Sequence, residues 1–287
     1  MLAALAMAGS AALAAAAVDP TAAPRWSLDW SPRTDSSIPL RDPRAAQPYA
    51  PKRQTSRIAR HGTDGSTIAL DHEFRDLDLP QVGGAAPATN GYVHRLILGW
   101  QHDGANRRLT LGAGLAVSSN ALKDPDSLRA SDLRPRLAAS TRWGGAGERS
   151  DTWLGLRIDD RLGALRVLPT IELHWRPTPT QVLAVGFPDS AWHWQLSPRW
   201  RTALTLGPDG GCWQVRDRAR TQRTRACNDA WQGAWRLDWQ PAHWARVGLE
   251  AGRRSAADLD YTLESGRAVQ VEAPAAWFGA VHLGLSL

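Results

Sequence analysis

The sequence contains very little lysine, phenylalanine and tyrosine, and it lacks a long apolar run. Among 287 residues there are 3 Phe and 3 Tyr, and Lys52 and Lys123 are the only lysines, so nearly all of the 34 basic residues are arginine. No interior segment is apolar enough to cross a membrane as a helix of about 20 residues. This excludes a helical membrane bundle, but not a membrane β-barrel, because alternating strands average to a low hydropathy, here -0.37.

The basic residues are dispersed rather than collected in one tail or patch. The formal net charge is +6, which by itself is compatible with binding to nucleic acid. A nucleic-acid-binding protein usually shows a clustered basic surface, and the arginines here are instead spread along alternating segments. We therefore expect no nucleic-acid partner, and dispersed arginines suit the polar interior of a barrel better.

Tryptophan is the one abundant aromatic residue, with 15 copies. Its ring is apolar and its N–H needs a polar partner, so it is favoured at membrane interfaces. A Trp-rich soluble core or a carbohydrate-binding face would give the same count.

The first 65 residues are expected to lie outside the main fold. Residues 1–17, MLAALAMAGSAALAAAA, resemble a secretory signal peptide because an Ala/Leu run ends in a small-residue cleavage pattern. Residues 18–65 are rich in Pro, Arg, Ser and Asp without sustained periodicity, and such a segment cannot bury enough apolar surface to fold alone. We predict a disordered periplasmic extension there.

The stretch ALRVLPTIELHWR, residues 164–176, separates its side chains with period 2. Leu165, Val167, Ile171 and Trp175 share one parity, and Arg166, Glu172 and His174 share the other, which predicts a strand with one apolar and one charged face. Pro169 falls on the apolar face and cannot donate to a neighbouring strand, so a bulge is expected there.

Similar alternation recurs through residues 66–287 and predicts about 12 strands. Connections near 103, 145, 177, 198 and 241 are short, and those at 75–90, 119–131, 218–227 and 254–273 are long. Short turns on the periplasmic side and long loops outside are typical of outer-membrane barrels. The predicted fold is therefore a single all-β, antiparallel, up-and-down transmembrane barrel over residues 66–287.

The chain as a whole resembles proteobacterial outer-membrane β-barrel proteins. The segments VLPTIELHWRPTPTQVLAVGFPDSAWHWQLSPRW and LGPDGGCWQV look like a group of such barrels classed as a domain of unknown function. The resemblance covers about residues 60–287. It implies location in the bacterial outer membrane, but it supplies no catalytic residue.

The charged parity of the strands predicts an Arg-rich lumen. On this assignment inward arginines outnumber inward carboxylates by about five, an excess that favours anions. The candidate lumen-lining residues are Arg134, Arg136, Arg157, Arg166, Glu172, His174, Arg199, Arg201, Arg236, Asp238, Arg246 and Glu250.

Cys212 and Cys227 are the only cysteines, and they flank a basic loop. In an exported protein a disulfide is the expected outcome. Two thiols are too few for a metal site, and the eight histidines show no HxH or HExxH spacing. We expect no metal and no cofactor.

The leading hypothesis is a narrow anion-biased pore or a solute-binding barrel that is not an enzyme. Its expected partners are outer-membrane lipid and lipopolysaccharide, the barrel assembly machinery and small anionic solutes. A barrel enzyme acting on lipid or envelope polymer is the first alternative. Its catalytic motif is missing from the sequence, although SSNALKD from Ser118 resembles polar residues of barrel phospholipases. A soluble Trp-rich glycan-binding β-sandwich is the second alternative.

Overall fold

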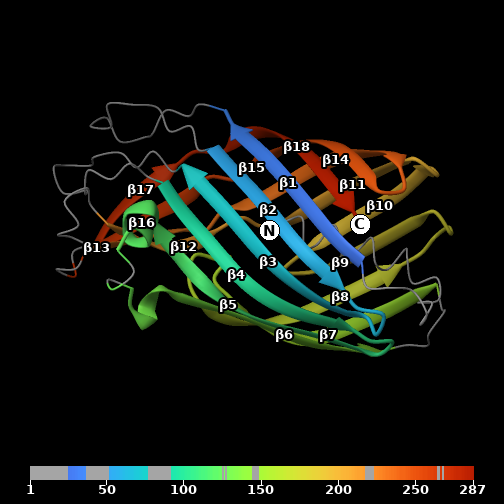
Figure 1. Cartoon of the computed structure of the whole chain (residues 1–287), viewed down its shortest axis with the longest axis horizontal. Helices are drawn as coiled ribbons and strands as arrows, with labels where there is room; N and C mark the ends of the chain where they lie inside the picture. The colour runs from blue at the N-terminus through green and yellow to red at the C-terminus, as the bar shows by residue number, and fades with distance from the viewer. Residues whose placement is uncertain are drawn as a thin grey trace.

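The computed structural model is a closed antiparallel β-barrel (Figure 1). It describes residues 25–36, 52–76, 92–124, 126, 128–143, 149–216, 223–263, 266 and 268–287. The proposed signal peptide and the turn near residue 145 lie outside these residues. No helix in the described part is long and apolar enough to cross a membrane.

Fourteen strands of the described residues form the barrel, rather than about 12. They are β1 (Arg25–Asp35), β2 (Lys52–His61), β3 (Ser66–Asp76), β4 (Tyr92–Asp103), β5 (Arg107–Ser118), β6 (Leu133–Trp143), β7 (Ser150–Asp159), β8 (Arg166–Trp175), β9 (Gln181–Phe187), β10 (Ser190–Ser197), β11 (Trp200–Pro208), β14 (Trp231–Ala242), β15 (Ala245–Arg254) and β18 (Ala276–Ser286). Each pairs with the next, and β18 pairs with β1 to close the ring. A closed ring also contradicts the β-sandwich alternative.

The two additional wall strands come from the segment that was expected to be a disordered extension. β1 pairs with β2 and with β18, and β2 pairs with β3 without a break, so residues 25–35 and 52–61 are part of the wall. In β1, Trp26, Leu28 and Trp30 are exposed while Ser31 and Arg33 are buried. The alternation was present, but Pro32 and the charged composition obscured it.

The outer face of the wall is apolar. Exposed fractions reach 60% for Leu98, 54% for Ile171 and 59% for Leu249, whereas inward arginines such as Arg236 are buried. Aromatic side chains gather towards the short-turn end of the barrel, where the exposed members include Trp26, Trp143, Trp175, Trp194, Trp200, Trp239 and Trp244. An apolar band bounded by aromatic residues is the surface that a β-barrel presents to lipid.

The strand through Pro169 has the predicted facing but no bulge. Ile171 and Trp175 are exposed and His174 is buried, as expected. Pro169 pairs with Leu156 of β7 in a continuous register. On its other side β8 pairs with β9 only from Ile171 onwards, so the missing N–H of Pro169 leaves no unpaired partner on a neighbouring strand.

The C-terminus and most of the short turns lie at one end of the barrel, and the long connections lie at the other, together with the short β7–β8 and β9–β10 connections (Figure 1). Two of the long connections contain strands of their own. β12 (Gly211–Arg216) and β13 (Arg223–Asn228) join β11 to β14, and β16 (Ala257–Leu263) and β17 (Ala268–Ala273) join β15 to β18. These four strands pair in the order β12, β13, β16, β17. We call them the cap sheet.

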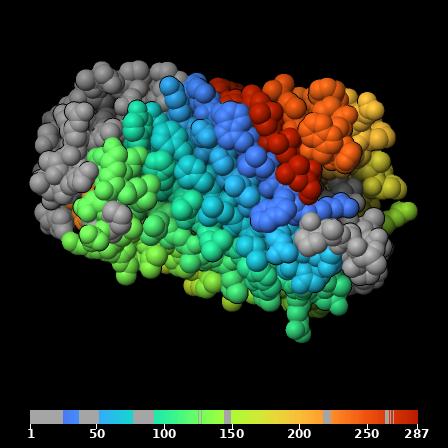
Figure 2. All heavy atoms as spheres, viewed as in Figure 1, coloured from blue at the N-terminus to red at the C-terminus, as the bar shows by residue number. Residues whose placement is uncertain are grey.

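The cap sheet is attached to the wall at its β12 edge. Gln214 of β12 forms a parallel bridge with Val117 of β5, next to the short helix α2 (Ser119–Leu122). Figure 2 shows one whole side of the barrel, on which β1 to β5 face the viewer. The predicted disulfide is confirmed: Cys212 and Cys227 are bonded directly across β12 and β13. It therefore clips two strands of the cap sheet rather than two strands of the wall.

Candidate functional site: the capped lumen

The inward parity of the strands places most of the predicted lumen residues inside the barrel. These residues are Arg134, Arg136, Arg157, Glu172, His174, Arg201, Arg236, Asp238, Arg246 and Glu250. Several of them contact strands that are not their neighbours. Arg108 Nη1 of β5, for example, lies 3.3 Å from Glu172 Oε2 of β8.

Two predicted lumen residues are placed elsewhere. Arg199 is exposed in the two-residue turn between β10 and β11, so the prediction is wrong for this residue. Arg166 is the first residue of β8, and it is exposed at the end of the barrel that carries the long connections. Alternation assigns a side to a residue but does not show where the strand leaves the lumen.

Trp213 of the cap sheet covers arginines of the wall. Its side chain is 1% exposed, and the guanidinium carbons of Arg75 and Arg95 lie 4.8 and 5.2 Å from its ring centroid. Trp213 also belongs to a buried apolar cluster that includes Val93 of β4 and Ala276 of β18. The cap sheet is therefore packed into this mouth of the barrel, between separated parts of the wall.

Asp209 links the cap sheet to the wall through charge. It lies between β11 and β12, and its carboxylate is 2.5 Å from Arg53 Nη1, 3.3 Å from Arg75 Nη2 and 3.4 Å from Arg33 Nη1. Burial acts to raise the pKa of Asp209, but these arginines outweigh it and hold the pKa well below its usual range. The carboxylate therefore stays ionised, and the three wall strands β1, β2 and β3 converge on it.

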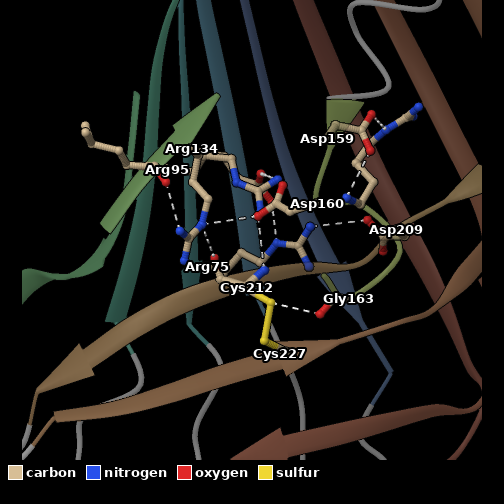
Figure 3. A network of polar contacts seen from close by, with 12 residues as sticks. Arg75, Arg95, Arg134, Asp159, Asp160, Gly163, Asp209, Cys212 and Cys227 are labelled. Atoms are coloured by element: carbon tan, nitrogen blue, oxygen red, sulfur yellow. Dashed lines mark hydrogen bonds and ion pairs between the residues drawn. A yellow bond between two sulfur atoms is a disulfide. The ribbon is translucent and has the colours of Figure 1, made fainter. Parts of the chain in front are cut away.

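A second set of ion pairs lies beside Asp209, in the same network of polar contacts (Figure 3). Asp160 Oδ2 is 3.0 Å from Arg95 Nη2 and 3.4 Å from Arg134 Nε. The connection that contains Asp160 also contacts the cap segment, because Arg161 O accepts a hydrogen bond from Gly210 N–H at 2.9 Å and Gly163 O lies 2.9 Å from Cys212 Sγ. The short connection between β7 and β8 is thus bent inward beneath the cap sheet.

Besides additional buried arginines such as Arg33, Arg53 and Arg75, the lumen holds carboxylates that alternation did not identify. Each of these has at least one arginine within 4 Å, and they are Asp29, Asp35, Asp151, Asp160, Asp189 and Asp209. Several lie in turns or in β1, where no inward strand was expected. Most of the interior charge is therefore internally neutralised.

One lumen cavity has more arginines than carboxylates among its lining residues. It is lined by five arginines and three carboxylates: Arg57, Arg95, Arg136, Arg236 and Arg246 with Asp29, Asp71 and Glu73. Its volume is about 40 Å³, which is room for a few water molecules or one small solute.

Arg136 is the least neutralised of these arginines. Its Nη1 lies 3.8 Å from Asp71 Oδ2, whereas Asp71 Oδ1 already lies 3.2 Å from Arg57 Nη1. The same Arg136 also lines a second cavity of about 130 Å³ with balanced charges, where Trp153 and Asp189 are among the lining residues. Arg136 therefore joins the two cavities.

The described residues contain no group of three or more His, Cys, Asp or Glu side chains placed to hold a metal ion.

Comparisons with known proteins return similar structures only. No family model and no curated protein matches the chain. Similar solved structures include the COG4313 outer membrane channel from Pseudomonas putida F1 (10% identity, 92% of this chain and 95% of that chain, TM-score 0.43). The toluene transporter TodX of P. putida (8%, 93% and 91%, 0.38) and OmpT, an outer membrane protein of Vibrio cholerae (9%, 92% and 97%, 0.34), are also similar.

The class of the protein follows from its own geometry rather than from these distant likenesses. A closed antiparallel barrel with an apolar outer face, aromatic residues near its ends and a charged interior defines a transmembrane β-barrel.

Proposed function

We propose that the chain is an outer-membrane β-barrel whose capped lumen binds a small oxyanion. The end with the short turns and the C-terminus faces the periplasm, and the cap sheet faces the outside, following the asymmetry of such barrels. The apolar face contacts lipid and lipopolysaccharide, and the barrel assembly machinery inserts the chain.

The observation that carries the proposal is the incompletely neutralised Arg136. A guanidinium group presents its N–H donors in a fork that matches the oxygens of sulfate, phosphate or a carboxylate. In the first cavity Arg57, Arg236 and Arg246 each have a carboxylate within 3.2 Å, and Arg136 does not. An oxyanion beside Arg136 would complete the charge balance of this cavity.

The cap sheet occupies one mouth of the barrel, which favours a binding site over a permanently open pore. Trp213 is buried in the mouth, and Asp209 ties the cap to three wall strands. In this proposal ions pass only when the cap is displaced, and the lumen proposal itself involves no chemical reaction.

Replacing Arg136 by glutamine is expected to weaken oxyanion binding. One charge-assisted hydrogen bond contributes about 1.5–3 kcal/mol, so the dissociation constant should rise by roughly 10- to 100-fold. Isothermal titration calorimetry with sulfate on the purified, folded barrel measures this. Arg199→Gln is the matched control because Arg199 is exposed in a turn, and it should bind sulfate as the natural chain does. Equal affinity in Arg136→Gln and the natural chain would contradict the proposal.

The affinity for sulfate is also expected to rise as the pH falls from 7.5 to 5. Burial raises the pKa of Asp189, in the connection between β9 and β10, to about 6 in spite of the opposing effect of Arg157. Protonation below this value removes one negative charge from the cavity that Arg136 shares. Sulfate keeps its charge over this range, and Asp189→Asn should flatten the pH dependence relative to the natural chain. A pH profile that is unchanged in Asp189→Asn would show that another group is responsible.

A further inference from the structure

Three polar side chains form a hydrogen-bonded chain on the outer, lipid-facing side of the barrel. His94 of β4 lies between the other two: its Nε2 is 2.8 Å from Ser119 Oγ, and its Nδ1 is 3.0 Å from His72 Nε2. None of the three side chains is fully buried. Leucine, isoleucine and tryptophan predominate on the outer face, although the outward residues Gln54, Ser56 and Arg60 of the neighbouring β2 are also polar.

The strand register places these three residues together. His94 is opposite Phe74 on β3 and opposite Val117 on β5. His72 and Ser119 each lie two residues along from these positions, so both are diagonal neighbours of His94 on the same face. The neighbouring Glu73 and Arg95 point to the lumen and are buried, which confirms that His72 and His94 point outward.

The residues around Ser119, His94 and His72 place these three side chains near the edge of the apolar band, at the end of the barrel that carries the cap sheet. Leu70 and Leu96 are each 41% exposed beside it. The rings of Phe74 and Tyr92 lie towards the cap, with the Phe74 centroid 5.3 Å from that of His94 and 5.8 Å from that of Tyr92. Aromatic residues of barrels mark the level of lipid headgroups and ester linkages.

The arrangement has the parts of an activated hydroxyl nucleophile. With the proton of His94 on Nδ1, that N–H donates to His72 Nε2, and His94 Nε2 accepts the hydrogen bond from the Ser119 hydroxyl. A hydroxyl nucleophile, a base in contact with it and a third group that fixes the tautomer of the base are what nucleophilic acyl transfer requires. The lumen contains a partial counterpart in which His61 contacts Ser27 at 3.0 Å and Thr67 at 3.1 Å, but a threonine replaces the orienting group.

We propose that Ser119, His94 and His72 are a lipid-facing site that hydrolyses carboxylic esters of membrane lipids. Ser119 Oγ attacks the ester carbonyl carbon while His94 Nε2 takes the hydroxyl proton. His94 then gives that proton to the departing alcohol oxygen as the ester bond breaks. Water, deprotonated by His94, then attacks the acyl carbon now attached to Ser119 Oγ. The acyl–Oγ bond breaks, the fatty acid leaves and His94 returns the proton to Ser119 Oγ, so one ester and one water give one acid and one alcohol. His72 acts as a positioning residue.

This site is independent of the lumen, so the two proposals can fail separately. Arg136→Gln should leave ester hydrolysis unchanged, and Ser119→Ala should leave sulfate binding unchanged. The activity also departs from the expectation of a non-enzymatic barrel. Among the histidines, alternation alone singled out only His174, as a lumen residue.

The experiment uses the full folded chain in vesicles, with the barrel fold verified by heat-modifiable migration on a gel. One set of vesicles contains phospholipid alone, the other also contains lipopolysaccharide, and released fatty acid is measured in both. A fluorophosphonate probe tests the hydroxyl directly. The expected result is release of fatty acid from at least one set of vesicles and attachment of the probe to Ser119. In Ser119→Ala the rate of release should fall by a factor of about 10⁴ or more, and the probe should no longer attach.

Three further variants separate catalysis from structure. Ser27→Ala removes the hydroxyl of the lumen pair and should retain full activity. His72→Ala should lower kcat by about 10²-fold with little change in KM, and His72→Gln, which keeps an acceptor for His94, should recover part of it. Absence of probe attachment and of release from both kinds of vesicle, or equal activity in folded Ser119→Ala, would overturn the proposal.

Discussion

Replacing Asp209 by asparagine is expected to release the cap sheet from the wall. The substitution leaves the guanidinium groups of Arg33, Arg53 and Arg75 buried near a neutral amide. Breaking one side of a buried ion pair typically costs about 3–5 kcal/mol. Hydrogen exchange of the amides of β12 and β13 measures the change, because local opening exposes them without unfolding the wall.

The same variant has a pH signature with a defined sign. The pKa of Asp209 is lowered in the folded chain, so its contribution to stability is fully present above the unfolded value of about 3.9 and is lost as the pH falls through the lower folded value. The difference between the natural chain and Asp209→Asn should therefore be full at neutral pH and shrink only in strong acid.

Asp64→Asn provides the matched control for the removal of a carboxylate. Asp64 lies in the short turn between β2 and β3 and bonds only its neighbour Ser66 among the described hydrogen bonds. Hydrogen exchange in the cap should be unaffected by this variant. If the amides of β12 exchanged as slowly in Asp209→Asn as in the natural chain, the link between the cap and the wall would not depend on Asp209.

Replacing Trp213 by alanine is expected to open the capped mouth. The indole is 1% exposed and covers Arg75 and Arg95. Truncating a buried tryptophan typically costs about 3–5 kcal/mol, because apolar contacts are lost and a cavity remains. The variant also removes the ring that separates Arg75 and Arg95 from the outside. Planar-bilayer recordings should show little conductance for the natural chain and an anion-preferring conductance for Trp213→Ala.

Trp143→Ala tests whether any loss of tryptophan has this effect. Trp143 is 73% exposed on the apolar face, so its removal should change neither the conductance nor the cap. An open channel in the natural chain would contradict the role given to the cap sheet, and a cation-preferring current in Trp213→Ala would contradict the role given to the arginines.

Local alternation was sufficient to predict the barrel and the facing of its best-patterned strands. In β8 the lipid face and the lumen face follow directly from a period of two. Alternation was insufficient for β2, whose outward residues Gln54, Ser56 and Arg60 are polar and leave Ile58 as its clear apolar signal. Wall strands of this kind are stabilised by hydrogen bonds to both neighbouring strands. The sequence of one strand does not show with which strands it pairs.

The candidate sites depended still more on partners distant in the sequence. Asp209 is 156 residues from Arg53, and no local pattern links them. Ser119, His94 and His72 are separated by 25 and 22 residues, and only the registers of β3 with β4 and of β4 with β5 bring them onto one diagonal. A shift of one residue in either register would move a member to the other face.

The sequence by itself determined the two-faced strands, the end of the barrel that carries the short turns and the identity of the disulfide pair. These depend on properties of a single strand or turn, or on the presence of only two cysteines. The tertiary structure alone decided that β1 and β2 complete a ring of fourteen, that β12, β13, β16 and β17 form a cap, and that Asp209 and Trp213 close the mouth. The physical reason is that ring closure and cap docking depend on pairing between distant segments, which local periodicity does not encode.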